Sequence, residues 1–77
     1  MIIEIEYYKG EISLFGKSQS ISELKQQFKN IESTYDKSTD NFIDLLCRTY
    51  QWTIIETDES PDFVYDRDTQ NLYKPNL

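Results

Sequence analysis

The residues of this chain that could most readily take part in binding or catalysis are six acidic residues within thirteen consecutive positions. They are Glu56, Asp58, Glu59, Asp62, Asp66 and Asp68. Carboxylates grouped in this way can bind calcium, serve as acid and base in hydrolysis, or present a negative surface to a basic protein. Acidic residues also occur in turns for purely local reasons, because an Asp side chain can hydrogen-bond its own backbone.

Neither calcium binding nor carboxylate catalysis fits the spacing. A helix-loop-helix calcium site needs oxygen ligands at alternate positions, a glycine at the sixth position and a glutamate at the twelfth. Counted from Asp66, these two positions hold Asn71 and Leu77, and counted from Asp58 the sixth is Phe63. A glycosidase needs two carboxylates held in a cleft, and a short domain whose acids lie in loops offers none. We therefore expect no metal and no cofactor.

Cys47 is the single cysteine, and the chain has no histidine. A nucleophilic thiol needs a neighbouring base or a positive environment to become a thiolate. The helical pattern around Cys47 places it on an apolar face, and Arg48 points about 100° away around the helix. We therefore expect Cys47 to be a small buried hydrophobic residue, and we expect no enzymatic activity.

Composition and charge exclude several classes of partner. The 77 residues carry a net charge of −6 at pH 7, and most of the excess lies in residues 39–77, where eight acids face three cations. Nucleic acids and anionic membranes both require a cationic surface, which this chain lacks. No apolar run approaches the roughly 20 residues that cross a bilayer, and a lone cysteine needs no oxidising compartment. These features predict a soluble cytoplasmic protein that binds neither nucleic acid directly nor membranes.

The N-terminal stretch alternates apolar and polar side chains with a period of two, which predicts a β-hairpin over residues 2–15. Its turn is predicted at residues 9–10, because glycine adopts positive φ at low cost. The inner pairs are then Ile5 with Leu14 and Tyr7 with Ile12, and the outer pairs are Glu6 with Ser13 and Tyr8 with Glu11. We expect Tyr7 to belong to the core.

Two amphipathic helices are predicted next. Residues 20–23 have the spacing of a capping box, and apolar residues then recur at intervals of three and four. This first helix is predicted to end within residues 31–35. The second is predicted over residues 41–50, with Thr39 or Asp40 as its N-cap. Its broad apolar face predicts contacts with both the sheet and the first helix.

The C-terminal half is rich in strand formers. Residues 52–57 predict one strand, and residues 63–65 and 72–73 predict two more around a turn. Grouped rather than alternating elements favour an α+β fold with the order ββααβββ, an antiparallel sheet, and both helices on one face. We expect one small domain over residues 1–77, with residues 74–77 as a frayed tail.

Tyrosine is more abundant than a small core can bury, with six in 77 residues. Tyr8 and Phe15 are predicted on the outer face of the hairpin, beside Glu4 and Glu6. Tyrosine is common at interfaces because it joins a large apolar body to a polar tip. These aromatic residues would form a binding face or a dimer contact, or they would cover the edges of a curled sheet.

Two functions fit these features. The first is a small non-enzymatic protein that acts through contact with another protein, as a monomer or a homodimer. The second is an acidic inhibitor or nucleic-acid mimic, of the type carried by phages and mobile elements, that blocks a basic groove of a nucleic-acid-handling partner. The mimic requires its carboxylates on one exposed surface. The predicted partner-binding residues are Tyr8, Phe15, Asp58, Glu59, Asp62, Asp66 and Asp68.

Overall fold

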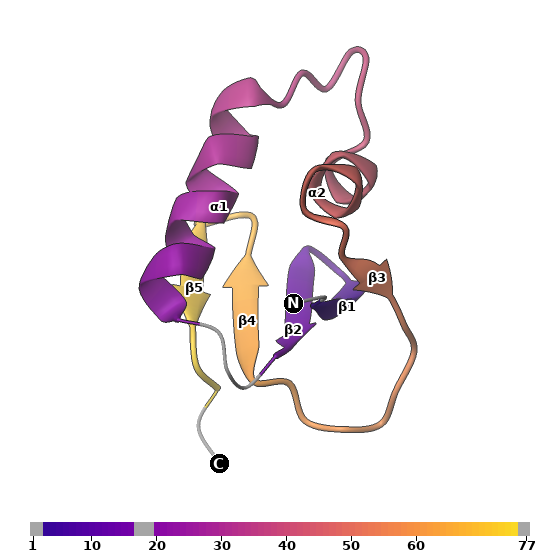
Figure 1. Cartoon of the computed structure of the whole chain (residues 1–77), viewed down its shortest axis with the longest axis vertical. Helices are drawn as coiled ribbons and strands as arrows, with labels where there is room; N and C mark the ends of the chain where they lie inside the picture. The colour runs from indigo at the N-terminus through magenta and orange to yellow at the C-terminus, as the bar shows by residue number, and fades with distance from the viewer. Residues whose placement is uncertain (1–2, 17–19, 76–77) are drawn as a thin grey trace.

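The chain forms a five-stranded sheet and two helices, as a computed structural model describes for residues 3–16 and 20–75 (Figure 1). The elements are β1 (Glu4–Tyr8), β2 (Glu11–Phe15), α1 (Ile21–Thr34), α2 (Phe42–Tyr50), β3 (Thr53–Ile54), β4 (Phe63–Asp66) and β5 (Asn71–Tyr73). The strands lie in the order β3-β1-β2-β4-β5. The predicted α+β class and the predicted order of elements are confirmed.

The hairpin of β1 and β2 has the predicted register. All four predicted pairs are present, including Tyr7 with Ile12. Lys9 and Gly10 form the turn with φ angles of 50° and 83°. Positive φ at both central residues is what a type I′ turn requires, and this turn matches the natural twist of the strands. Turn chemistry and side-chain alternation therefore specify the same pairing.

Tyr7 does not join the core as expected, because its side chain is 46% exposed. It lies on the same face as Ile5 of β1 and Ile3, which precedes the strand, and both isoleucines are buried. The neighbouring strand β3 pairs with β1 only as far as Ile5, so the ladder stops short of Tyr7. The prediction was therefore correct about the face on which Tyr7 lies and wrong about its burial.

The helix α1 begins and ends as predicted, although its capping differs. Leu24, Phe28 and Ile31 form its buried stripe. Ser20 is the N-cap, but its hydroxyl lies 2.8 Å from the hydroxyl of Ser22 and makes no hydrogen bond to the helix backbone. The predicted capping box is therefore absent, and packing of the apolar stripe stabilises the helix instead.

The N-cap of α2 is Asn41, and not Thr39 or Asp40. Its Oδ1 accepts a hydrogen bond from the backbone N–H of Asp44 at 3.2 Å. The backbone N–H groups of Thr39 and Asp40 both donate to the C=O of Asp36. These two residues therefore belong to the turn before the helix, and the first residue free to cap is the next one.

The strand β3 is shorter than predicted and runs parallel to β1. Only Thr53 and Ile54 pair with β1, although the strand was predicted to extend to Thr57. The backbone N–H of Thr57 donates to the carboxylate of Glu6 at 3.3 Å instead of continuing the ladder. The prediction of an antiparallel sheet is therefore wrong for this pair, and the sheet is mixed, with one parallel pair beside three antiparallel pairs among the described residues.

The predicted second hairpin is present as β4 and β5. Tyr65 of β4 pairs with Ile12 of β2 on one side and with Leu72 of β5 on the other, and all three side chains are buried. Residues 74–75 continue the chain without regular structure. The last two residues of the predicted tail, 76–77, lie outside the described residues, as do 1–2 and 17–19.

Both helices cover one face of the sheet, and the core between them is aromatic at its centre (Figure 1). Phe28 of α1 stacks on Tyr65 of β4 with ring centroids 3.9 Å apart and an interplanar angle of 8°. Trp52, which precedes β3, meets Phe28 edge-on at 5.7 Å. The hydroxyl of Tyr50 donates to the C=O of Gln27 at 3.3 Å. The second helix therefore packs on α1 as well as on the sheet, as predicted.

Phe28→Ala is expected to lower the free energy of unfolding by about 3–5 kcal/mol, because it leaves a cavity between Tyr65 and Trp52. Urea denaturation followed by Trp52 fluorescence measures the change. Lys29→Ala, on the exposed side of the same helix, is the control and is expected to change stability by about 0.5 kcal/mol or less. Equal stability of both variants would show that the stack does not anchor the core.

Asn41→Ala is expected to cost about 1 kcal/mol, because it removes the side-chain oxygen that accepts from the N–H of Asp44. Ser20→Ala is the matched control at the other helix, where the hydroxyl makes no cap bond, and a smaller loss is expected there. Chemical denaturation of both variants provides the comparison. A larger loss for Ser20→Ala than for Asn41→Ala would contradict the capping described above.

Candidate binding groove at the free edge of the sheet

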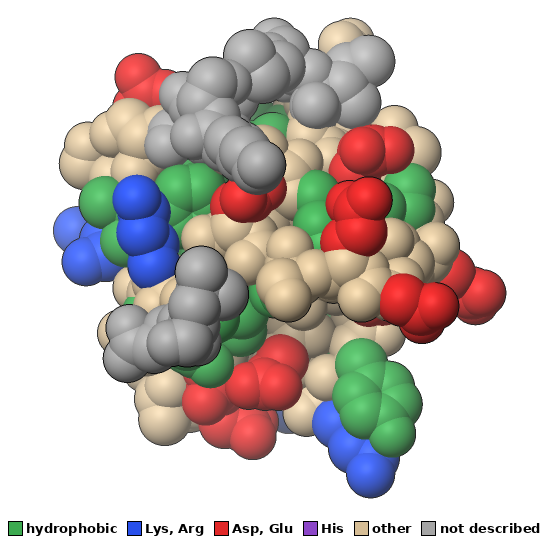
Figure 2. Space-filling model, turned by 90° about the horizontal axis from the view of Figure 1, so that it is seen from below, with side chains coloured by type: hydrophobic (Ala, Val, Ile, Leu, Met, Phe, Trp, Pro, Cys, Tyr) green, Lys and Arg blue, Asp and Glu red, His purple; other side chains and the backbone are tan. Residues whose placement is uncertain are grey.

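The acidic residues predicted to bind a partner do not form a single surface. Asp62 precedes β4 and Asp66 ends it, so the strand separates them. Asp62 Oδ2 accepts the N–H of Gly16 at 3.0 Å, and Asp66 Oδ1 accepts the N–H of Asp68 at 2.9 Å. Asp68 itself is exposed in the turn that follows β4. Figure 2 shows acidic side chains in separate groups on the face seen from below. Asp62 and Asp66 thus have local structural roles.

Tyr8 and Phe15 lie on the outer face of the hairpin as predicted, but at opposite ends of it. Tyr8 pairs with Glu11 beside the turn, and Phe15 pairs with Glu4 at the far end of the ladder. Tyr8 is 66% exposed, whereas Phe15 is half-buried. The two aromatic side chains therefore do not form one patch.

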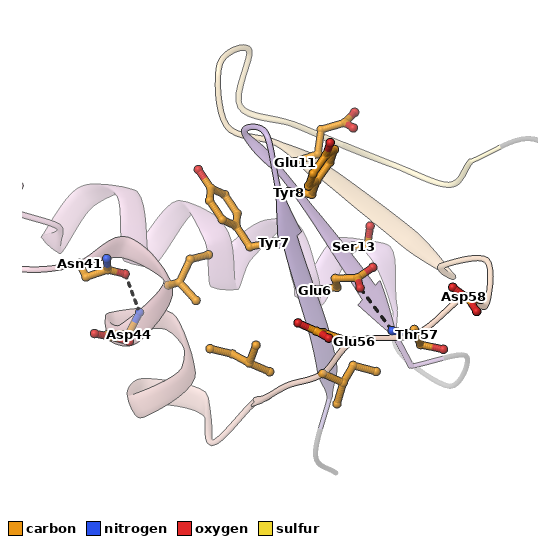
Figure 3. Close-up of a pocket in the computed structure, with 13 residues that line it drawn as sticks. Glu6, Tyr7, Tyr8, Glu11, Ser13, Asn41, Asp44, Glu56, Thr57 and Asp58 are labelled. Atoms are coloured by element: carbon orange, nitrogen blue, oxygen red, sulfur yellow. Dashed lines mark hydrogen bonds between the residues drawn. The ribbon is translucent and has the colours of Figure 1, made fainter.

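A shallow groove of about 810 Å³ lies along the edge of β1, with α2 on one side and the chain after β3 on the other (Figure 3). Tyr7 points toward α2, whereas Glu6 and Tyr8 lie on the opposite side of β1. We call this hollow the edge groove. Its walls include Glu6, Tyr7, Tyr8, Ile43, Ile54 and Asp58.

The strand β1 has an unpaired backbone segment in the edge groove. The N–H of Thr53 donates to the C=O of Ile3 at 2.9 Å. The N–H of Ile55 donates to the C=O of Ile5 at 2.8 Å. Alternate residues of a strand direct their backbone groups the same way, so the N–H and C=O of Tyr7 also face this side. No described residue pairs with them there, because the ladder ends at Ile5.

Two hydrogen bonds position the walls of the edge groove, and both are drawn in Figure 3. The carboxylate of Glu6 accepts the N–H of Thr57 at 3.3 Å, which holds the chain after β3 against a side chain of β1 and not against its backbone. The cap between Asn41 and Asp44 places the first turn of α2 on the other side. The opening between the two walls is therefore built into the fold by polar contacts on each side.

The edge groove is negatively charged and partly apolar. No Lys or Arg is present among the described residues that line it, whereas five carboxylates are, from Glu6, Glu11, Asp44, Glu56 and Asp58. Tyr7 and Ile54, which is 56% exposed, add apolar surface. Grouped exposed apolar side chains with a polar rim are typical of surfaces that bind proteins.

The sequence predicted two residues of this groove and missed its centre. Tyr8 and Asp58 line the groove, whereas Glu59 is exposed in the neighbouring loop and does not line it. Tyr7 and Ile54 were missed because both belong to patterns typical of buried strand residues. A signal was present in the acidic residues Glu56, Asp58 and Glu59, because Asp and Glu are depleted in strands and limit how far β3 can extend along β1.

The remaining reactive groups do not converge on the edge groove. Cys47 is half-buried on α2 and does not line it. Burial raises the pKa of its thiol, and the negative charge of Asp44 raises this pKa further. The thiol is therefore protonated near neutral pH, which disfavours nucleophilic chemistry. Within residues 3–16 and 20–75, no group of three or more Cys, Asp or Glu side chains is arranged to hold a metal ion.

A second hollow of about 390 Å³ lies against α1 and β5. Of its lining residues, Tyr65 donates its hydroxyl to Glu32 Oε2 at 2.7 Å. Arg67 Nη2 lies 4.0 Å from Glu32 Oε1, and the guanidinium carbon of Arg67 lies 3.7 Å from the centre of the Phe42 ring. These contacts join β4, α1 and α2, so they serve stability rather than binding.

Comparisons with known proteins supply no further constraint on the edge groove. No protein-family model matches this chain, and no curated protein sequence or solved structure matches it. Neither of the helices in the described part of the chain combines the length and apolar character needed to cross a bilayer. The function must therefore be inferred from the residues of the groove.

The stability of the protein is expected to fall as the pH rises above about 10, because the pKa of Tyr65 is raised in the folded state. Burial raises this pKa most, and the hydrogen bond to Glu32 adds to the shift. A raised folded-state pKa leaves the contribution intact below the unfolded pKa and removes it as pH rises through the folded one. Urea denaturation between about pH 8 and 11 measures the slope.

Tyr65→Phe removes the ionisable hydroxyl. The free energy of unfolding of this variant is therefore expected to fall less steeply with pH than that of the wild-type protein over the same range. The control is Tyr8→Phe, which removes an exposed hydroxyl and is expected to keep the wild-type slope. If Tyr65→Phe and wild type lose stability in parallel, alkaline destabilisation does not arise from Tyr65.

Proposed function

We propose that this protein acts by binding another protein through the edge groove, and that it is not an enzyme. The observation that carries the proposal is the unpaired backbone of Tyr7, which lies beside exposed apolar side chains in a hollow of the surface. Exposed sheet edges are ready sites for pairing with another chain, and proteins usually shorten, charge or cover them. An open edge that also has apolar walls fits recognition of a partner.

The charge of the edge groove supports a protein as its partner. Phosphate groups of nucleic acids and of anionic lipids would be repelled by five carboxylates. A second copy of the chain is less favoured at this position, because its groove would bring the same carboxylates against these ones. The partner is therefore a different protein with positive charge at its contact.

The nucleic-acid mimic receives less support from this geometry. It requires a continuous array of free carboxylates, whereas Asp62 and Asp66 accept backbone hydrogen bonds at opposite ends of β4. On the face that Figure 2 shows, acidic side chains lie in separate groups. General protein recognition needs only the edge groove, so we adopt it as the function.

Photo-crosslinking tests the proposal. A benzophenone amino acid at Tyr8 is expected to crosslink a discrete protein in a lysate of the native host, and the same group at Gln26, exposed on α1, is not. Adding Ile54→Asp to the Tyr8 probe should reduce the crosslink about fivefold or more, because it charges an apolar wall of the groove. Lys29→Asp is the control for added negative charge and should leave the crosslink unchanged.

Two results would contradict the proposed function. One is the absence of any crosslinked protein at position 8. The other is equal crosslinking at positions 8 and 26, or equal crosslinking with and without Ile54→Asp, because either would show that contact is not specific to the edge groove.

A further inference from the structure

We infer that the edge groove binds an extended segment in which basic and apolar residues alternate, and that this segment pairs with β1 as an added antiparallel strand. The inference rests on the proposed function and specifies the chemistry of the partner. It follows from three properties of the groove: where hydrogen bonds are available, where apolar side chains lie, and where the carboxylates lie.

The backbone of Tyr7 provides the pairing site. Its N–H and C=O face the side that β3 leaves open, beyond the last rung at Ile5. In an antiparallel pair, one residue placed opposite another can exchange both backbone hydrogen bonds with it. A single partner residue opposite Tyr7 therefore satisfies both free groups of this strand, and the short length of the open segment suits a short added strand.

The residue opposite Tyr7 is expected to be apolar. Side chains that are opposite one another on paired strands lie on the same face of the sheet. This residue therefore shares the face of Tyr7, which points toward α2 (Figure 3). Ile43 of α2 and Ile54 of β3 also line the groove and provide further apolar contact.

The residues on either side of it are expected to be basic. They project to the opposite face, where Glu6 and Tyr8 lie (Figure 3). Glu56 and Asp58 line the same groove after β3. A Lys or Arg there can pair with these carboxylates, and Tyr8 already has the Lys9 amine 5.3 Å from its ring centre, which shows that its face accepts a cation. The combined pattern is basic, apolar, basic.

Synthetic peptides test this pattern directly. The probe is an N-acetylated, C-amidated peptide with the core Lys-Val-Lys-Val-Lys between glycines, titrated into the isotopically labelled protein and followed by NMR. Binding is expected to shift the amide signals of Tyr7 and Ile54 and to slow hydrogen exchange at the Tyr7 amide. A peptide of the same composition with the core Lys-Lys-Val-Val-Lys is expected to bind about tenfold more weakly, because it cannot place charges and apolar groups on opposite faces.

Backbone methylation separates strand pairing from simple charge attraction. Methylating the backbone nitrogens of the valines removes the donors that face β1, including the one opposite Tyr7, and is expected to weaken binding about fivefold or more. Methylating the backbone nitrogens of the lysines instead is the matched control, because these backbone N–H groups face away from β1. Its affinity is expected to remain close to that of the unmethylated peptide.

A pair of protein variants locates the charge contacts. Glu56→Gln combined with Asp58→Asn is expected to weaken the alternating peptide about fivefold, since two exposed ion pairs are lost. Glu23→Gln combined with Asp68→Asn removes the same net charge outside the groove and should change the affinity less than about twofold. Circular dichroism confirms that both variants are folded.

The outcomes distinguish this inference from the function on which it rests. If position 8 crosslinks a protein but the alternating and rearranged peptides bind equally, strand addition is overturned and protein binding stands. If methylating the backbone nitrogens of the lysines weakens binding as much as methylating those of the valines, antiparallel pairing at Tyr7 is overturned. If the Tyr7 amide signal shifts with protein concentration alone, the occupant is a second copy, and the inferred basic segment is wrong.

Discussion

The packing of Phe28 against Tyr65 and Trp52 is the interaction on which the rest of the structure depends. It joins α1 to β4 and to the residue that introduces β3, three segments far apart in the chain. A domain of this size has enough apolar residues for one such core. Both helices therefore share one face of the sheet, and among the described residues no helix covers the opposite face (Figure 1).

Polar contacts extend this core without adding a second one. Tyr65 uses its ring in the aromatic stack and its hydroxyl to donate to Glu32, while Arg67 lies between Glu32 and the ring of Phe42. The burial that raises the pKa of Tyr65 is thus a consequence of packing. The hydroxyl of Tyr65 pairs with the carboxylate of Glu32 across β4 and α1, so these two side chains contribute to stability.

The edge groove depends on whether the chain that follows β3 pairs with the backbone of Tyr7 or with the side chain of Glu6. A longer β3 would have paired with Tyr7 and closed the edge of β1. The carboxylate of Glu6 instead accepts the N–H of Thr57, and the chain leaves the sheet at that point. One side-chain hydrogen bond therefore replaces the next backbone rung, and the result is an open strand position surrounded by carboxylates. The core lies under the helices and the groove lies at the edge of the sheet, so the two are in different parts of this fold.

The sequence by itself determined the features that depend on near neighbours. The register of the first hairpin follows from strict alternation and a turn with Gly10, and the buried stripe of α1 follows from its spacing of three and four. Tyr8 and Asp58, which were predicted to bind a partner, are exposed and line the edge groove. Only the tertiary structure decided how far β3 extends, that it is parallel to β1, and that Tyr7 is consequently exposed. The physical reason is that these outcomes depend on which of several distant groups captures a given N–H, as Glu6 does for Thr57, and periodicity along the chain carries no information about that competition.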